Sequence, residues 1–96
     1  MDPSESDRLD RAFQALSDPT RRAIWLELGR EPGLTTAELG ARRKRMTRWA
    51  VMKHLRVLRD AGLIETLPEG RARRHYRDVR GLRTLRRWLD EAVADR

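Results

Sequence analysis

The sequence predicts a single, mainly helical domain in which one β-hairpin precedes the last helix. Three observations support this class. Five stretches repeat apolar residues at helical spacing. One further stretch has strand-like segments on either side of a turn. The length of 96 residues suffices for one small core. We expect residues 1–6 to form a flexible polar tail and residues 7–96 to form the domain.

Helix-start signals place the first three helices. Apolar side chains over residues 9–16 recur every three or four positions and predict the first helix. Asp18 is a favourable N-cap and Pro19 suits the first helical position, so a second helix is expected to begin there. Thr35 has a glutamate three residues later, which is the capping-box pattern for a short third helix. A short extra strand is expected before it, near Leu34.

The second half of the chain predicts a fourth helix, the hairpin and a last helix. The fourth helix is expected over 47–61, with a threonine cap at its start and Gly62 in the left-handed conformation at its end. The hairpin is expected to have strands at 63–67 and 73–79, with a turn that begins at Pro68. A wide apolar stripe marks the last helix. The predicted order is therefore α-α-α-α-β-β-α.

Basic charge is concentrated in one part of the chain. The formal net charge is +7, but residues 39–87 hold sixteen Lys or Arg and only four acids. Within residues 39–59 there are eight bases and no acid. A helix face that is merely solvated mixes both signs, so this one-sided charge predicts binding to a nucleic acid.

The basic charge accompanies a helix-turn-helix pattern, in which a short helix, a tight turn and a second helix follow one another. Val51, Leu55 and Leu58 share one side of the 47–61 helix, and the basic residues lie on the other. In this motif the second helix enters the major groove of DNA. The candidate DNA-contacting residues of the helix are Thr47, Arg48, Trp49, Met52, Lys53, His54 and Arg56, and those of the turn are Arg43, Lys44 and Arg45.

Residue chemistry suggests roles for some of these side chains. Arg48 can form a bidentate contact with guanine, whereas Lys53 and Arg56 are better placed for phosphates. His54 is expected at the edge of the helix, hydrogen-bonded within the domain or to a phosphate. Two interpretations of Trp49 stay open: it packs against the preceding turn, or it contacts sugars and thymine methyl groups.

The hairpin over 67–77 is a candidate wing. Arg71, Arg73 and Arg74 would reach phosphates or an adjacent minor groove. The alternative is that these charges only protect a strand edge from pairing with another molecule. Strand alternation places Tyr76 opposite Arg73, His75 and Arg77, and we expect Tyr76 to be structural.

Three stretches resemble the ArsR/SmtB-type winged-helix repressors: FQALSDPTRRAI at 13–24, MTRWAVMKHLRVLRDAGLI at 46–64 and GRARRHY at 70–76. The resemblance implies a homodimeric bacterial repressor with dimer contacts from the first and last helices. The apolar residues expected at that interface are Leu9, Phe13, Leu82, Leu85, Trp88 and Leu89. The alternative is that they close the core of the monomer.

The chain departs from the family at two places. Thr47, Arg48 and Trp49 replace the usual serine-rich opening of the reading helix, so the operator of better-known relatives does not carry over. The thiolate metal-sensing motif of the third helix is absent, since Leu39, Gly40 and Ala41 occupy that region and the chain has no cysteine. We therefore expect a subgroup without that sensor.

Composition argues against other classes. The chain has two histidines, no glycine-rich phosphate loop and no serine beside a histidine, so we expect no metal, no cofactor and no enzymatic activity. Its polar, acidic start is unlike a signal peptide, and its longest apolar runs reach only four residues, so we expect a cytoplasmic, nucleoid-associated protein without membrane contact.

The function predicted from these observations is sequence-specific binding of double-stranded DNA by a homodimeric repressor. A two-fold dimer predicts a pseudo-palindromic operator with half-sites about 10 base pairs apart. The alternative is a winged helix whose basic face binds an acidic protein or an RNA. Two hypotheses for the signal stay open, a small apolar effector or repression set by the protein's own level.

Overall fold

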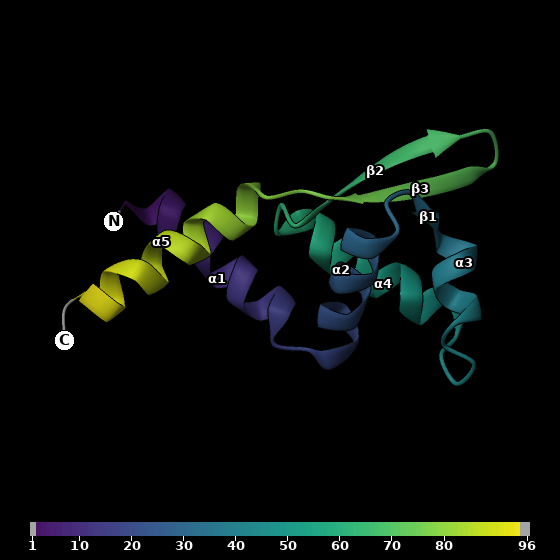
Figure 1. Ribbon diagram of the computed structural model, residues 1–96, viewed down its shortest axis with the longest axis horizontal. Coiled ribbons are helices and arrows are strands. Elements are labelled where there is room, and N and C mark those ends of the chain that lie inside the picture. The colour runs from purple at the N-terminus through teal and green to yellow at the C-terminus, as the bar shows by residue number, and fades with distance from the viewer. Residues whose placement is uncertain (1, 95–96) are drawn as a thin grey trace.

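The computed structural model describes residues 2–94 and shows a mainly helical domain with a small antiparallel sheet (Figure 1). The elements are α1 (Pro3–Leu16), α2 (Pro19–Arg30), β1 (Leu34–Thr35), α3 (Thr36–Ala41), α4 (Arg48–Asp60), β2 (Ile64–Glu69), β3 (Ala72–Arg77) and α5 (Arg80–Ala94). The order confirms the predicted fold class, including the short extra strand. The sheet has the order β1-β3-β2, so β3 is its central strand.

Side-chain caps fix the starts of the helices. Asp18, Thr35 and Thr47 each accept a hydrogen bond from the backbone amide three residues later, at 3.0, 3.1 and 3.1 Å. At α3 the capping box is complete, because Glu38 Oε1 accepts the Thr35 amide at 3.0 Å. That hydrogen bond also holds the pKa of Glu38 below its usual value. These caps are the ones that the sequence predicts.

The first helix corrects one prediction. Residues 3–6, which were expected in a polar tail, form the first turn of α1. The physical reason is an N-cap at Asp2, within a stretch whose polar composition suggests a tail. Asp2 accepts the Glu5 amide at 2.8 Å, and Pro3 occupies the first helical position, where its missing N–H costs nothing. Met1 lies outside the described residues.

The hairpin corrects a second prediction. Pro68 and Glu69 belong to β2, where they face Arg73 and Ala72, so the turn lies at Gly70 and Arg71. Gly70 has φ of 59°, a left-handed conformation that suits glycine. A proline is tolerated in β2 because this strand lies at the edge of the sheet and need not donate on its outer side.

The core consists of two clusters. The larger one joins α2, α3, α4 and the sheet, and its fully buried members include Ile24, Leu28, Leu39 and Leu58. The smaller one holds Leu9, Ala12 and Leu85, where α1 packs against α5. The molecule is elongated, 46 × 26 × 23 Å. Figure 1 shows α1 and α5 at one end and α3 with the tip of the hairpin at the other.

Candidate nucleic-acid interface

Helix α4 has one buried and one exposed face, as the sequence predicts. Val51, Leu55 and Leu58 are buried in the larger core cluster. On the other face Trp49 is 67% exposed and Met52 is 52% exposed. Large apolar side chains are therefore held in solvent on the first two turns of a helix whose N-terminal end carries partial positive charge.

The turn between α3 and α4 is fastened to α2 by two arginines. Arg43 pairs with Glu27 and donates to the Leu39 carbonyl oxygen at 2.8 Å, and its side chain is only 11% exposed. Arg42 pairs with Glu31 and lies 3.5 Å from Glu27. Arg43, expected to contact DNA, is thus placed where it positions the turn.

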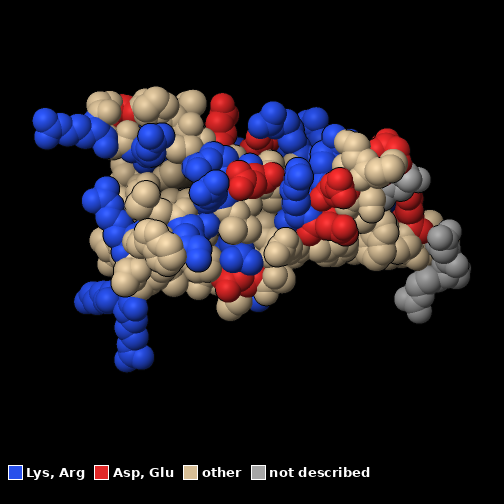
Figure 2. All heavy atoms as spheres, turned by 180° about the vertical axis from the view of Figure 1, so that it is seen from behind, with Lys and Arg blue, Asp and Glu red and all other residues tan. Residues whose placement is uncertain are grey.

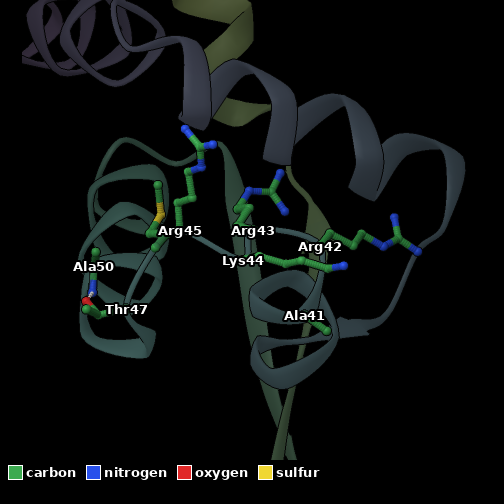
Figure 3. A pocket seen from close by; sticks show the side chains of 8 residues that line it. Ala41, Arg42, Arg43, Lys44, Arg45, Thr47 and Ala50 are labelled. Carbon is green, nitrogen blue, oxygen red and sulfur yellow. Dashed lines mark hydrogen bonds between the residues drawn. The ribbon is translucent and has the colours of Figure 1, made fainter.

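A hollow of about 740 Å³ lies over this turn (Figure 3). Its lining is residues 41–47 together with Ala50, which is almost one continuous stretch of chain. In Figure 3 the guanidinium groups of Arg42 and Arg43 point toward α2, while Lys44 extends across the hollow. The hollow is the concave surface of the turn itself, and Lys44 and Arg45 form no ion pair with any residue between 2 and 94.

The exposed aromatic ring of Trp49 on α4 makes a cation–π contact with a lysine. Lys53 Nζ lies 4.5 Å from the centroid of the Trp49 ring, one helical turn away. The Trp49 side chain is 67% exposed, so most of its surface stays available to a partner. Arg56 lies on the same side of the helix, exposed and 4.0 Å from Asp60.

His54 lies away from the exposed face. Its Nδ1 is 3.2 Å from the Arg21 guanidinium and 3.9 Å from Asp18, at the junction of α1 and α2. Asp18 has a pKa below its usual value, mainly because it accepts the Arg21 amide and also because His54 is near. His54 is therefore placed to hold α4 against that junction.

Of the three wing arginines expected to contact DNA, one is tethered and two are free. Arg74 pairs with Glu69 at 2.6 Å and donates to the Gly33 carbonyl oxygen at 2.9 Å, which ties β3 to the loop before β1. Arg71 and Arg73 are exposed and have no ion-pair partner within residues 2–94. The tip of the hairpin therefore presents two uncompensated charges.

Six bases that have no ion-pair partner within residues 2–94 gather at one end of the molecule. They come from the turn, the first half of α4 and the tip of the wing: Lys44, Arg45, Arg48, Lys53, Arg71 and Arg73. Figure 2 shows long Lys and Arg side chains projecting from the end of the molecule opposite the chain termini, with acids concentrated nearer the middle and the other end. We call these six residues the outward bases. The turn, α4 and the wing tip thus each contribute positive charge to this end of the molecule (Figure 2).

Known proteins resemble this chain in sequence and in fold. A family described as a helix-turn-helix domain matches residues 16–66. The HTH-type transcriptional regulator Rv2034 of Mycobacterium tuberculosis is 47% identical over 81 residues, which cover 84% of this chain and 74% of that protein. The crystal structure of the ArsR family transcriptional regulator RHA00566 superposes with a TM-score of 0.84 at 37% identity, covering 93% of this chain and 90% of that one. The chain belongs to the ArsR family.

A second solved structure agrees. The ArsR-like transcriptional regulator from Rhodococcus sp. RHA1 has a TM-score of 0.82 at 35% identity and covers 99% of this chain and 85% of that one. This ArsR-family member is a DNA-binding transcriptional regulator with the winged helix-turn-helix fold. Its lack of cysteine fits a subgroup without the thiolate sensor.

The described residues of the regulator hold neither a cluster of metal ligands nor a helix that could span a membrane. Between residues 2 and 94 no three His, Asp or Glu side chains come close enough together to hold a metal ion. Over the same residues, no helix combines the length and the apolar character that crossing a membrane requires.

The apolar residues of α1 and α5 that are expected at a dimer interface differ in how far the monomer buries them. Leu9 and Leu85 are buried within the monomer, between the two helices, so for these two the alternative of closing the monomer's core is the better description. Phe13 and Trp88 pack edge to face, with ring centroids 5.4 Å apart, and remain 41% and 40% exposed. Leu89 is 46% exposed beside them, whereas Leu82 is half-buried. An apolar strip therefore remains uncovered on the monomer.

His75 shares one side of β3 with Arg73 and Arg77, as strand alternation predicts, but unlike these two arginines it is buried. It is 1% exposed, with Nε2 2.8 Å from the Thr36 hydroxyl and Nδ1 2.9 Å from the Thr66 hydroxyl. Burial, together with the charges of Arg59 and Arg73, lowers the pKa of His75 to about 4. A neutral histidine thus links α3 to the wing. The sequence does not show that His75 is buried while Arg73 and Arg77 are exposed. Its burial depends on β3 being the central strand, which only the pairing of β1 with β3 reveals.

The base of the wing is also held by a contact that the sequence does not reveal. The Arg77 guanidinium lies 3.4 Å from the centroid of the Trp25 ring, and Trp25 Nε1 donates to the Leu63 carbonyl oxygen at 2.9 Å. A Cβ atom at Gly29 would come 2.0 Å from Arg77 Nη1, so glycine leaves the space that the guanidinium occupies. Tyr76, expected to be structural, is half-buried near Gly33.

Proposed function

We propose that this ArsR-family regulator is a repressor that binds a specific duplex operator as a homodimer. In this proposal the first half of α4 enters the major groove and the wing reaches the neighbouring backbone or minor groove. The observation that carries it is the position of the six outward bases. All of them lie on the turn, on α4 or on the wing tip, although other arginines of the same segments are neutralised by acids.

The outward side chains divide into base-reading and phosphate-binding groups. Arg48 lies in the first turn of α4, from which a guanidinium can donate to O6 and N7 of a guanine. Trp49 and Met52 present apolar surface suited to the methyl groups of thymine. Lys53 and Arg56 continue the same face toward phosphates.

Residues at the edges of the surface complete the interface. Thr47 caps α4, and Lys44 and Arg45 precede it in the turn, where the motif meets the DNA backbone. On the wing Arg71 and Arg73 contact phosphates or the minor groove. Arg43 and Arg74 act by positioning the turn and the hairpin, since both are engaged by acids and backbone carbonyl oxygens.

The uncovered strip on α1 and α5 supports the dimer. Phe13, Trp88 and Leu89 form the centre of the proposed two-fold interface, with Leu82 at its edge. A small domain that leaves aromatic and aliphatic side chains together in solvent gains free energy by burying them against a second copy. The dimer then places two reading helices on successive major grooves, which implies half-sites about 10 base pairs apart.

The remaining parts of the proposal follow from the same surface. The protein acts in the cytoplasm on chromosomal DNA, performs no catalysis and needs no resident metal or cofactor for DNA binding. Duplex DNA is favoured over RNA because Trp49 is the one exposed aromatic ring among the described residues of the basic surface, whereas recognition of unpaired bases uses several stacking rings.

Selection of bound duplexes from a random library, in the presence of unspecific competitor DNA, tests this function. We expect an inverted repeat whose half-sites are about one helical turn apart. Enrichment of no motif, or equal binding to RNA and to an acidic polypeptide at the same ionic strength, would overturn the proposal in favour of a general anion-binding surface.

A further inference from the structure

A second basic hollow lies at the other end of α4. It has a volume of about 560 Å³ and is enclosed by α1, the last turn of α4 and the first turns of α5. The arginines that line it are Arg8, Arg11, Arg59, Arg80 and Arg87, and the acids are Glu5 and Asp60. Three elements that are far apart in the sequence therefore bring positive charge to one concavity.

Only part of this charge is compensated. Arg87 pairs with Glu5 at 2.8 Å, and Arg80 pairs with Asp78 at 2.5 Å. Within residues 2–94 no acid pairs with Arg8, Arg11 or Arg59, and Arg59 donates only to the Thr66 hydroxyl, at 3.3 Å. Like charges that converge on a concave surface raise the local potential and attract anions, and a bound anion removes their mutual repulsion.

The hollow is separate from the outward bases. Helix α4 has 13 residues, which corresponds to about 20 Å, and Arg59 lies near its end whereas Arg48 opens it. Figure 1 shows the end of α4 beside the start of α5, away from α3 and the wing tip. The concavity suits a small ligand that several guanidinium groups can surround.

The same place joins the reading helix to the helices of the proposed dimer. The Gly81 amide donates to the Gly62 carbonyl oxygen at 3.0 Å, and a Cβ atom on Gly81 would come 2.1 Å from the Ala61 carbonyl oxygen. This is a very close backbone approach between α4 and α5. A ligand held across it contacts α1, α4 and α5 together, so it biases how the reading helix is held relative to the dimer helices.

We propose that this hollow binds a small polyanion carrying phosphate or carboxylate groups, and that binding shifts operator affinity. Guanidinium groups bind both kinds of group through paired, charge-assisted hydrogen bonds. Arg8 and Arg11 hold the anion from α1 and Arg59 holds it from α4, with Arg80 and Arg87 at the α5 side. The regulatory clause depends on the proposed DNA-binding function, whereas the binding site does not.

Calorimetric titration of the full chain, without DNA and at constant ionic strength, tests the site. The probes are pyrophosphate for phosphate chemistry and citrate for carboxylate chemistry. The variant R8Q/R11Q removes two exposed charges from the hollow, and R83Q/R86Q removes two from elsewhere on α5 as the matched control. We expect binding of at least one probe to weaken about tenfold or more in R8Q/R11Q and to be unchanged in the control.

Nuclear magnetic resonance of the arginine Nε–H groups locates the probe on the unaltered protein. Shifts concentrated at Arg8, Arg11 and Arg59 support the site. Shifts concentrated at Arg71 and Arg73, or equal probe binding by R8Q/R11Q and the control, overturn it. If R8Q/R11Q leaves probe binding intact but flattens the salt dependence of operator binding, these arginines contact DNA phosphates and the proposal is also overturned.

Operator titrations with and without the bound probe test whether the anion changes operator affinity. A shift in affinity that R8Q/R11Q abolishes supports it, and an unchanged affinity overturns it. Because the site is measured without DNA, loss of the DNA-binding proposal would leave the calorimetric result standing, and loss of the site would leave operator binding standing.

Discussion

Replacing the two free wing arginines should change the salt dependence of operator binding by a calculable amount. Arg71 and Arg73 are exposed and without an ion-pair partner within residues 2–94, so each contributes a full charge to the proposed DNA-binding surface. The variant R71Q/R73Q removes four charges from a dimer. For duplex DNA the slope of log K against log salt concentration is about −0.9 per neutralised phosphate, so the slope should become less negative by about 3.6.

The assay is operator binding, measured by fluorescence anisotropy, at several salt concentrations between 50 and 200 mM. Over this fourfold range a slope difference of 3.6 changes the ratio of wild-type to variant affinity by about 150-fold. The variant R83Q/R86Q, which removes the same charge from α5, should retain the wild-type slope. An unchanged slope in R71Q/R73Q would refute the assignment of the wing to phosphates and favour its role as a protected strand edge.

Three further predictions concern stability and assembly. Gly81→Ala should lower the free energy of unfolding by more than about 2 kcal/mol, because its Cβ would collide with the Ala61 carbonyl oxygen, while Gly40→Ala, where nothing lies within 4 Å, should be neutral or stabilising in urea titrations. A lower free energy of unfolding for Gly40→Ala, together with an unchanged value for Gly81→Ala, would contradict this reasoning. His75 has a pKa of about 4 in the folded state and 6.5 as its ordinary value, so the folded state binds fewer protons, and stability present above pH 6.5 should fall by up to about 3 kcal/mol as the pH falls to 4. The His75→Gln variant should lose this part of the pH dependence of stability. If its stability changed with pH in parallel with that of the wild type, His75 would not be the group responsible. Leu89→Lys places a charge in the uncovered strip and should give monomers in sedimentation at concentrations where the wild type is dimeric, and an unchanged mass would place the interface elsewhere.

Much of the fold follows from local rules that act within a few residues. The caps at Asp18, Thr35 and Thr47 and the buried face of α4 are predictable because each depends on neighbours three or four positions away. Asp2 followed the same rule, but the acidic composition around it favoured a tail. The hairpin turn was misplaced because a proline usually marks a turn, and only the edge position of β2 allows it inside a strand.

The site was predictable as a surface but not residue by residue. The excess of bases over acids in residues 39–87 located the turn, α4 and the wing. Which arginines are free depends on acids distant in the sequence, since Glu27 on α2 neutralises Arg43 in the turn. The position of His54 likewise depends on Asp18, which lies 3.9 Å away at the junction of α1 and α2. Such pairings depend on tertiary packing, which residue spacing does not encode.

The base preference of Arg48→Gln tests the central claim most directly, because it asks whether the first turn of α4 reads sequence. The wild type and the variant are compared by the same selection from a random duplex library. We predict that the variant loses a guanine preference at one position in each half-site, with the half-site spacing unchanged and a discrimination loss of about 1–3 kcal/mol at that position. An identical motif with uniformly weaker binding would contradict the claim and assign Arg48 to the phosphate backbone.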